Sequence, residues 1–222
     1  VLVLSGEVAR TISREIQIML TAQDHARLAN ARPVAPEAQE AYLKGRYLLF
    51  KRTSEAVTES REFFRRAIDK EPGFALAYAA LALSWVFDYG SFPPEQACSR
   101  AKEAALRALD LDGRLADAHT ALGHVALFYE WDWEAADREL RRALELNPGD
   151  SEAHLRSATL LAIEGRMEEA IERAKVALAL NPLSLWHGDM LASVYWSAGR
   201  HDEAIEQCRR TLELDPQRSW TL

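Results

Sequence analysis

The sequence has few cysteines, glycines and prolines, and it has no long hydrophobic run. Its 222 residues include two Cys, ten Gly and eight Pro, and 48% are hydrophobic, which argues against disorder over most of the chain. Cys98 and Cys208 are too few for a disulfide framework, so both are interpreted as small packed thiols. No apolar stretch approaches the ~20 residues that span a bilayer, and the first residues lack a signal-peptide pattern. The sequence therefore predicts no membrane segment and a cytoplasmic location.

The sequence also lacks a net positive charge and the usual motifs of enzymes. The formal net charge is -7, whereas a nucleic-acid-binding surface needs a clustered positive stripe. There is no HExxH, no CxxC, no glycine-rich phosphate loop and no nucleophile elbow. His119 and His124 are five residues apart and do not share a helix face. We therefore expect no direct nucleic-acid contact, no catalytic residue, no metal site and no cofactor.

What the sequence does contain is an internal repeat. Pro148, Pro182 and Pro216 lie 34 residues apart and close the similar phrases ALELNP, ALALNP and TLELDP. Gly113 and Pro72 end two related phrases upstream. A fixed period of this size indicates a solenoid of stacked units. The predicted solenoid covers residues 37–218, with units at about 41–74, 75–115, 116–150, 151–184 and 185–218, and the second unit carries an insertion that includes Pro93 and Pro94.

Each unit reads as two helices with small residues where the helices must approach closely. In the fourth unit these are Ala158 in the first helix, Gly165 at the turn, and Ala170, Ala174 and Ala177 in the second helix. The same arrangement recurs at Ala192, Gly199, Ala204, Cys208 and Thr211 in the fifth unit, and at Gly123, Ala136, Leu140 and Ala143 in the third. We expect Leu178 and Leu180 to be buried against the first helix of the next unit.

This pattern of small residues, with a proline near the end of a 34-residue period, resembles the tetratricopeptide repeat. The resemblance covers about residues 41–218. It is weaker in the first unit, where Ser60 and Phe64 replace the usual small residues. It implies an all-α fold, a right-handed superhelical α-solenoid of about five helix-turn-helix units, preceded here by an N-terminal helical extension.

A narrower resemblance comes from the phrases LSGEVARTISREI, ARPVAPEAQEAYLKGRY and ALGHVALFYEWDWEAADRELRRALELNP. They look like the tetratricopeptide regions of bacterial multidomain regulators with a winged-helix, adenylate cyclase or serine/threonine kinase domain and a TolB-like segment. Residues 1–36 would then end a preceding domain. Residues 5–20 read as an amphipathic helix, Thr21 as the cap of a second short helix, and Ala31–Pro36 as a hinge. Residues 219–222 would begin a truncated repeat.

In the family, the first helices of successive units line a concave groove that binds a protein or peptide. The matching positions of this sequence are Leu76, Leu83, Asp117, Thr120, His124, Glu152, Leu155, Thr159, Trp186, Asp189, Ser193 and Trp196. The fifth position of each unit lacks the Lys, Arg and Asn that grip a terminal carboxylate in other members. We expect an apolar or basic partner segment, because aromatic side chains anchor interfaces and Asp117, Glu152 and Asp189 would attract positive charge.

Other readings of the same residues remain open. Trp186 and Trp196 could line a binding face or pack against neighbouring helices, and the acidic residues could be solvated surface charges. Trp133 is interpreted as structural, whereas Trp131 is left undecided. The leading function is a non-catalytic interaction scaffold in a larger bacterial signalling or transcription-regulatory protein. The alternatives are a structural module that forms homo-oligomers and a small-molecule sensor.

Overall fold

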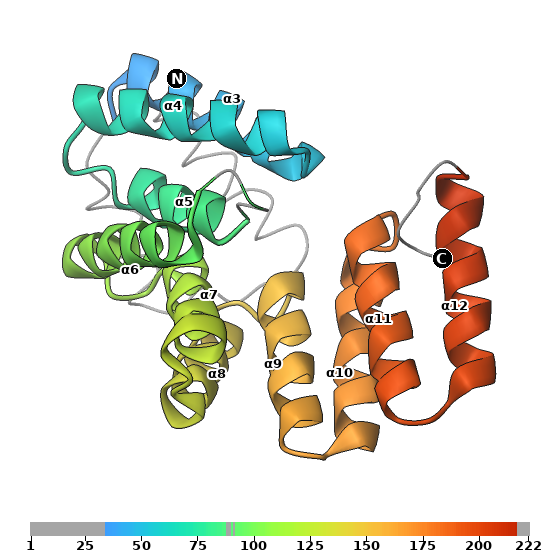
Figure 1. Cartoon of the computed structure of the whole chain (residues 1–222). Helices are drawn as coiled ribbons and strands as arrows, with labels where there is room; N and C mark the ends of the chain where they lie inside the picture. Colours follow the sequence, from blue (N-terminus) through green and yellow to red (C-terminus); the bar gives the residue numbers. More distant parts are fainter. Residues whose placement is uncertain (1–33, 88–89, 91, 217–222) are drawn as a thin grey trace, which may run out of the picture.

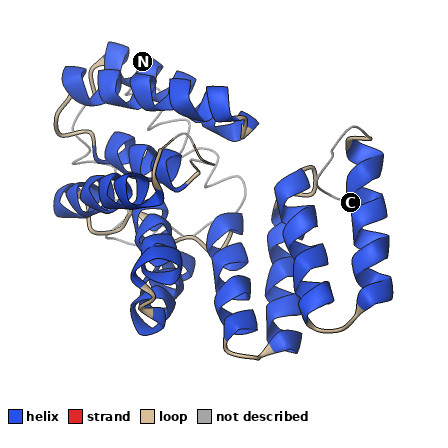
Figure 2. Ribbon diagram, in the orientation of Figure 1, coloured by secondary structure: helices blue, strands red, loops and turns tan. Residues whose placement is uncertain are grey.

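The computed structural model describes residues 34–87, 90 and 92–216, and these residues form helices without any strand (Figures 1 and 2). In chain order the elements are α3 (Pro36–Lys51), α4 (Ser54–Lys70), α5 (Ala75–Val86), α6 (Pro94–Leu111), α7 (Ala116–Val125), the π-helical turn η1 (Ala126–Glu130), α8 (Trp133–Leu146), α9 (Ser151–Ile163), α10 (Met167–Leu180), α11 (Leu185–Ser197) and α12 (His201–Leu214). The all-α solenoid is confirmed.

The predictions for the chain ends fall mostly outside the described residues. The amphipathic helix at 5–20, the cap at Thr21 and the truncated repeat at 219–222 all lie there. Of the expected hinge Ala31–Pro36, the structure describes the last three residues, and Pro36 is the first residue of α3.

The helices pair as the repeat pattern predicts. Each unit contributes two helices in contact, namely α3 with α4, α5 with α6, α7 with α8, α9 with α10 and α11 with α12. The second helix of each unit also packs on the first helix of the next, from α4 on α5 to α10 on α11. The elements therefore follow one another as a curved stack from α3 to α12 (Figure 1).

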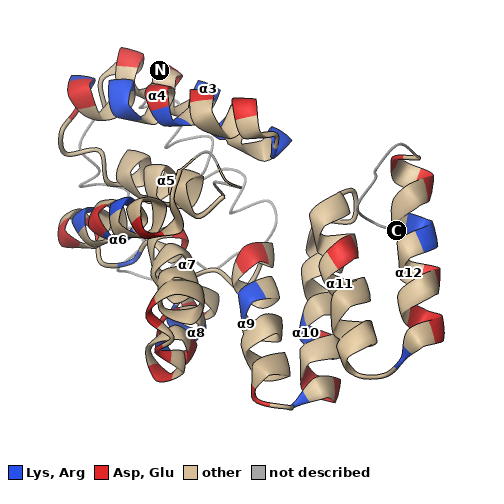
Figure 3. Ribbon diagram, viewed as in Figure 1, with Lys and Arg blue, Asp and Glu red and all other residues tan. Residues whose placement is uncertain are grey.

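The first and second helices of a unit differ in their charge. Figure 3 shows α5 without Lys, Arg, Asp or Glu, and α11 with Asp189 as its only such residue, whereas α12 carries both signs along its length. A helix that packs on both sides has few positions that can hold a charge in water. This explains the few charges of α5 and α11, whereas α3, at the start of the described stack, carries charges of both signs.

The turn inside each unit requires a left-handed residue. Gly165 and Gly199 take this position in the last two units, with φ of 79° and 74°. In the third unit the residue is Trp131, with φ of 56°, and in the first it is Arg52, with φ of 57°. Glycine adopts this conformation without steric cost, whereas other residues are strained there.

The third unit contains one residue more than the period. Gly113 and Pro148 are 35 residues apart, and the first helix of that unit ends in η1. A π-helical turn absorbs a single inserted residue inside a helix. Here it closes with the Asp132 amide donating to the Ala126 carbonyl at 3.0 Å, so the register of α8 is kept.

The small residues of the repeat are where the helices touch. Ala158, Ala170, Ala174 and Ala177 are fully buried between the helices of the fourth unit and their neighbours. In the first unit, where Phe64 replaces a small residue, Gly45 of α3 faces it, and a Cβ at Gly45 would lie 2.5 Å from the Phe64 ring. The glycine on one helix thus compensates for the bulk on the other.

The prediction for the end of α10 is half right. Leu178 packs into the cluster that joins the fourth and fifth units, as expected. Leu180 does not, because 45% of its surface is exposed. It is the last residue of α10, so α11 offers no facing turn beyond it.

Candidate functional site on the concave surface

The residues of the predicted groove come from α5, α7, α9 and α11, but they are not all accessible. Leu76 and Trp196 are 45% and 63% exposed, and Ser193 is exposed as well. The half-buried members are Asp117, His124, Thr159, Trp186 and Asp189. The buried members are Leu83, Thr120, Glu152 and Leu155.

The buried members correct the expected extent of the groove. Leu155 has no exposed surface and Leu83 has 7%, so both are core residues rather than contact residues for a partner. The first helices lie against one another, α5 on α7 and α9 on α11, and this packing covers side chains that a helix pattern alone would leave facing the groove. Accessible surface is concentrated on α11 and at the start of α5.

Two acidic residues of the groove are already paired with arginines of the first unit. Arg46 of α3 donates to the Asp117 carboxylate of α7 at 2.5 Å. Arg52, at the turn after α3, donates to the Glu152 carboxylate of α9. The Arg52 guanidinium also lies 3.5 Å above the Phe87 ring. Asp117 and Glu152 therefore act as internal ion-pair partners in this structure.

Glu152 is the centre of a buried cluster that joins three units. Glu152 Oε2 accepts from Arg156 at 3.3 Å. His187 Nε2 of α11 lies 3.5 Å from Glu152 Oε1, the oxygen that accepts from Arg52. Burial alone would raise the pKa of Glu152, but the charges of Arg52 and Arg156 and the nearby His187 together lower it. A buried carboxylate that stays ionised needs such partners. The cluster therefore fixes the spacing between the first, fourth and fifth units.

A second polar contact positions the start of α9. Asp150 accepts from the backbone amides of Glu152 at 3.0 Å and Ala153 at 3.1 Å, so it is the N-cap of the helix. Its other oxygen accepts from the Thr120 hydroxyl of α7 at 2.7 Å. Thr120 is therefore a structural contact between units. Burial raises the pKa of Asp150 despite these hydrogen bonds.

Burial lowers the pKa values of the histidines at the groove. Burial, and then the Arg156 charge, lower the pKa of His124 well below its ordinary value, and its ring lies 4.7 Å from the Phe128 ring. Burial is also the main cause of the lowered pKa of His187. His119 and His154 lie elsewhere, with Nδ1 of His119 2.8 Å from Glu139 and Nδ1 of His154 3.3 Å from Arg173. Within the described residues no three His, Cys, Asp or Glu side chains are grouped as metal ligands would be.

The tryptophans divide between packing and exposure. Trp186 is half-buried on α11, whereas Trp196, at the end of the same helix, is 63% exposed and has its ring 4.5 Å from the His201 ring. Trp131 and Trp133 are 69% and 43% exposed at the turn of the third unit. Trp196 is thus the large aromatic residue of the predicted groove that a partner could reach.

Sequence reasoning missed Arg46 and Arg52. Both follow the small position of the first helix, and nothing in the helical period indicates that their side chains cross to the third and fourth units. Their only sequence signal is that each has an acidic counterpart among the groove positions.

Among the described residues, no helix is both long and apolar enough to cross a bilayer.

Comparison with known proteins finds family matches in the last three units. Two tetratricopeptide-repeat models match residues 125–184 and 189–218. A Rhizobium meliloti (strain 1021) protein named "Putative adenylate cyclase 3" is 29% identical over 133 residues, which are 58% of this chain and 22% of the relative. The chain thus corresponds to less than a quarter of that protein's length.

Solved structures of tetratricopeptide proteins share the fold. A thermophilic TPR protein of Thermus thermophilus superimposes with a TM-score of 0.64 at 24% identity, over 82% of this chain and 93% of that one. YrrB, described as a TPR protein with an unusual peptide-binding site, gives a TM-score of 0.50 at 21% identity, over 90% and 96%. Repeats of this family are protein-interaction modules rather than enzymes. The chain thus contains tetratricopeptide repeats at residues 125–184 and 189–218 and shares the fold of tetratricopeptide proteins.

Proposed function

We propose that this chain is the partner-binding, regulatory region of a larger bacterial signalling or transcription-regulatory protein. The repeats themselves supply an interaction scaffold, and the observation that carries the larger context is the match to a Rhizobium protein of which this chain covers only 22%. In such a protein the repeats would bind a partner, or another part of the same chain, and thereby tune a separate output domain.

The concave surface of the fifth unit is the part that supports binding best. Trp196 and Ser193 are exposed there, and a large aromatic side chain is a typical anchor of an interface. Asp117 and Glu152 are engaged by Arg46 and Arg52, so a basic partner would have to displace these arginines. The structure therefore favours the apolar partner segment over the basic one.

A selection of random peptides on the immobilised chain tests this proposal. Selected peptides should be apolar, and Trp196→Ala should weaken their binding at least about tenfold, which corresponds to about 1.4 kcal/mol. Trp131→Ala is the matched control, because Trp131 is an aromatic residue at the turn of the third unit with 69% exposure outside the predicted groove. Equal binding by parent and Trp196→Ala, with both folded by circular dichroism, would exclude this surface.

Self-association is a second candidate that one observation supports. Leu43 and Tyr47 lie two residues before and two residues after Gly45 on α3, and they are 57% and 65% exposed. The same positions around the small residue of later units are covered, for example Ala121 and Val125 around Gly123, with 0% and 2% exposed. We propose that a second copy covers this face. Sedimentation should then show a dimer that Tyr47→Lys dissociates, whereas a monomer at all concentrations would contradict it.

A further inference from the structure

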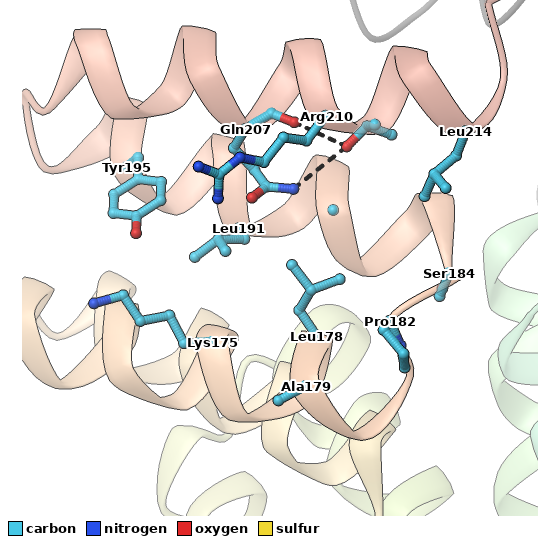
Figure 4. A pocket seen from close by; sticks show the side chains of 12 residues that line it. Lys175, Leu178, Ala179, Pro182, Ser184, Leu191, Tyr195, Gln207, Arg210 and Leu214 are labelled. Carbon is cyan, nitrogen blue, oxygen red and sulfur yellow. Dashed lines mark hydrogen bonds between the residues drawn. The ribbon is translucent and has the colours of Figure 1, made fainter.

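A groove of about 470 Å³ opens between α10 and α12, with α11 as its floor (Figure 4). Leu178 and Pro182 come from the α10 side, Leu191 from α11, and Arg210 and Leu214 from α12. The residues of α11 that face it differ from those of the predicted concave groove. Because a helix turns once in 3.6 residues, the two sets lie on opposite sides of α11. Gly188, Leu191 and Tyr195, with the N-cap residue Ser184, face this groove, and Trp186, Asp189, Ser193 and Trp196 belong to the concave set.

The groove exists because one side chain of the repeat is missing. Four residues before the small residue of the first helix, the second, third and fourth units carry a ring, namely Tyr78, His119 and His154. The fifth unit carries Gly188 at this position. In the first unit the residue is Ala41, and a smaller groove of about 240 Å³ opens beside it.

In the third and fourth units the histidine ring contacts a side chain of the second helix. His119 Nδ1 lies 2.8 Å from Glu139, and His154 Nδ1 lies 3.3 Å from Arg173. Both partners stand nine residues before the closing proline of their unit, and Gln207 occupies this position in the fifth unit. With no ring to meet, the Gln207 amide turns to the Thr211 hydroxyl at 3.5 Å.

A second exchange accompanies the missing ring. Thr211 stands where the other four units have alanine, at Ala67, Ala108, Ala143 and Ala177. A Cβ at Gly188 would lie 2.4 Å from the Thr211 hydroxyl oxygen, so a ring at Gly188 and a threonine at 211 exclude each other. The fifth unit thus combines two exchanges, in which the ring is absent and the Thr211 and Gln207 side chains lie beside Gly188 at the groove.

The residues that line the groove indicate which kind of ligand it can bind. Leu178, Leu191 and Leu214 supply apolar surface, while Lys175 and Arg210 are the charged residues of the lining, which contains no Asp or Glu. Lys175 and Arg210 pair with Glu172 and Glu206 on their own helices, at 2.7 Å and 3.2 Å, in exposed contacts that a ligand can exchange. The chain as a whole has a net charge of -7, so this cationic rim departs from its surroundings.

We propose that this outer groove binds an acidic protein segment that carries one aromatic side chain. The aromatic ring occupies the groove beside Gly188, and it packs on Leu178 and Leu191. Acidic residues on either side of the ring pair with Lys175 and Arg210. The site is separate from the concave surface, so it is independent of whether that surface binds a partner.

The test uses fluorescein-labelled pentapeptides with the sequences EEWEE, KKWKK and EEAEE, measured by fluorescence anisotropy on the whole chain at low salt. We expect EEWEE to bind at least about tenfold tighter than the other two. In a ¹⁵N spectrum of the complex, the amide of Gly188 should shift, while that of Ser193 on the concave side should not. Added salt should weaken the binding.

Two variants and one control show whether the peptide binds in the groove or is only attracted by the charge of the surface. Arg210→Glu should lower the affinity for EEWEE at least about tenfold, whereas Arg209→Glu, an exposed neighbour outside the lining, should change it less than about threefold. The triple variant Gly188→His, Gln207→Glu, Thr211→Ala rebuilds the third unit's His119, Glu139 and Ala143 at the groove, so it should remain folded and lose binding.

Several results would overturn the proposal. Equal binding of EEWEE and KKWKK, or equal binding by the parent and the folded triple variant, would do so. A shift at Ser193 in place of Gly188 would move the peptide to the concave surface. A dimer of the parent that the triple variant abolishes would instead assign the groove to a second copy of the chain.

Discussion

The Arg52 guanidinium, at the turn between α3 and α4, donates a hydrogen bond to the Glu152 carboxylate at the start of α9, 100 residues later. In a linear solenoid each repeat contacts only its neighbours. Here a side chain of the first unit also covers the Phe87 ring of the second unit and reaches the fourth. The contact couples units that the repeat architecture would leave independent.

This coupling predicts the effect of removing the arginine. Arg52→Gln should lower the free energy of unfolding by about 1–3 kcal/mol, because Glu152 is 7% exposed and would lose one of its two cationic partners. Urea denaturation followed by circular dichroism measures this change. Arg65→Gln, which breaks the exposed pair with Glu62, is the control and should cost less than about 0.5 kcal/mol. Equal effects of the two variants would mean that the Arg52 pair is no more than a surface contact.

The buried histidines predict how stability depends on pH. Burial is the main cause of the lowered pKa values of His124, His154 and His187, so the folded state binds fewer protons than the unfolded state just below the ordinary histidine pKa of about 6.5. The free energy of unfolding should therefore fall as the pH drops from about 7.5 to about 5.5. Urea denaturation at several pH values measures the slope. His124→Gln should make it shallower, and an unchanged slope would show that His124 titrates alike in both states.

The arrangement of the helices could be predicted from the sequence because it depends on residues that recur. The 34-residue spacing of Pro148, Pro182 and Pro216 fixed the units, and the buried alanines marked the contacts between helices. The π-helical turn also had a signal, since Gly113 and Pro148 are one residue further apart than the period. Each of these features is local, and a helix responds to local sequence.

The accessible surface could not be predicted in the same way. A family position places Leu155 on the concave side of α9, but the approach of α7 and α11 buries it completely. The pairing of Glu152 with Arg52 depends on the curvature of the two intervening helix pairs, α5–α6 and α7–α8. Curvature accumulates small rotations between units, and no single unit of the sequence contains it.

The turn of the third unit predicts a stabilising substitution. Trp131 has φ of 56°, in the left-handed region that glycine occupies in the last two units, and 69% of its surface is exposed. Trp131→Gly should raise the free energy of unfolding by about 0.5–1 kcal/mol, because it relieves backbone strain and removes few contacts. Thermal or urea unfolding measures the change. Gly165→Ala introduces the same strain at the equivalent turn and should lower stability by a similar amount; a loss of stability in Trp131→Gly would instead assign the tryptophan a packing role.

The contact between α7 and α8 predicts that Gly123→Ala is destabilising although alanine is the better helix former. Helix propensity alone would favour the substitution by about 1 kcal/mol. The added Cβ, however, would lie 2.7 Å from Leu140 Cγ, and Leu140 is 1% exposed and has no room to move. We expect a net loss of about 1–2 kcal/mol in urea denaturation, because overpacking outweighs propensity. Gly113→Ala is the control, since the nearest atom to its Cβ is 3.8 Å away, and it should leave stability within about 0.5 kcal/mol.

Adding Leu140→Ala to Gly123→Ala removes the clash, so the double variant should cost less than the sum of the two single changes. Additive losses would show that the two helices do not touch at this pair.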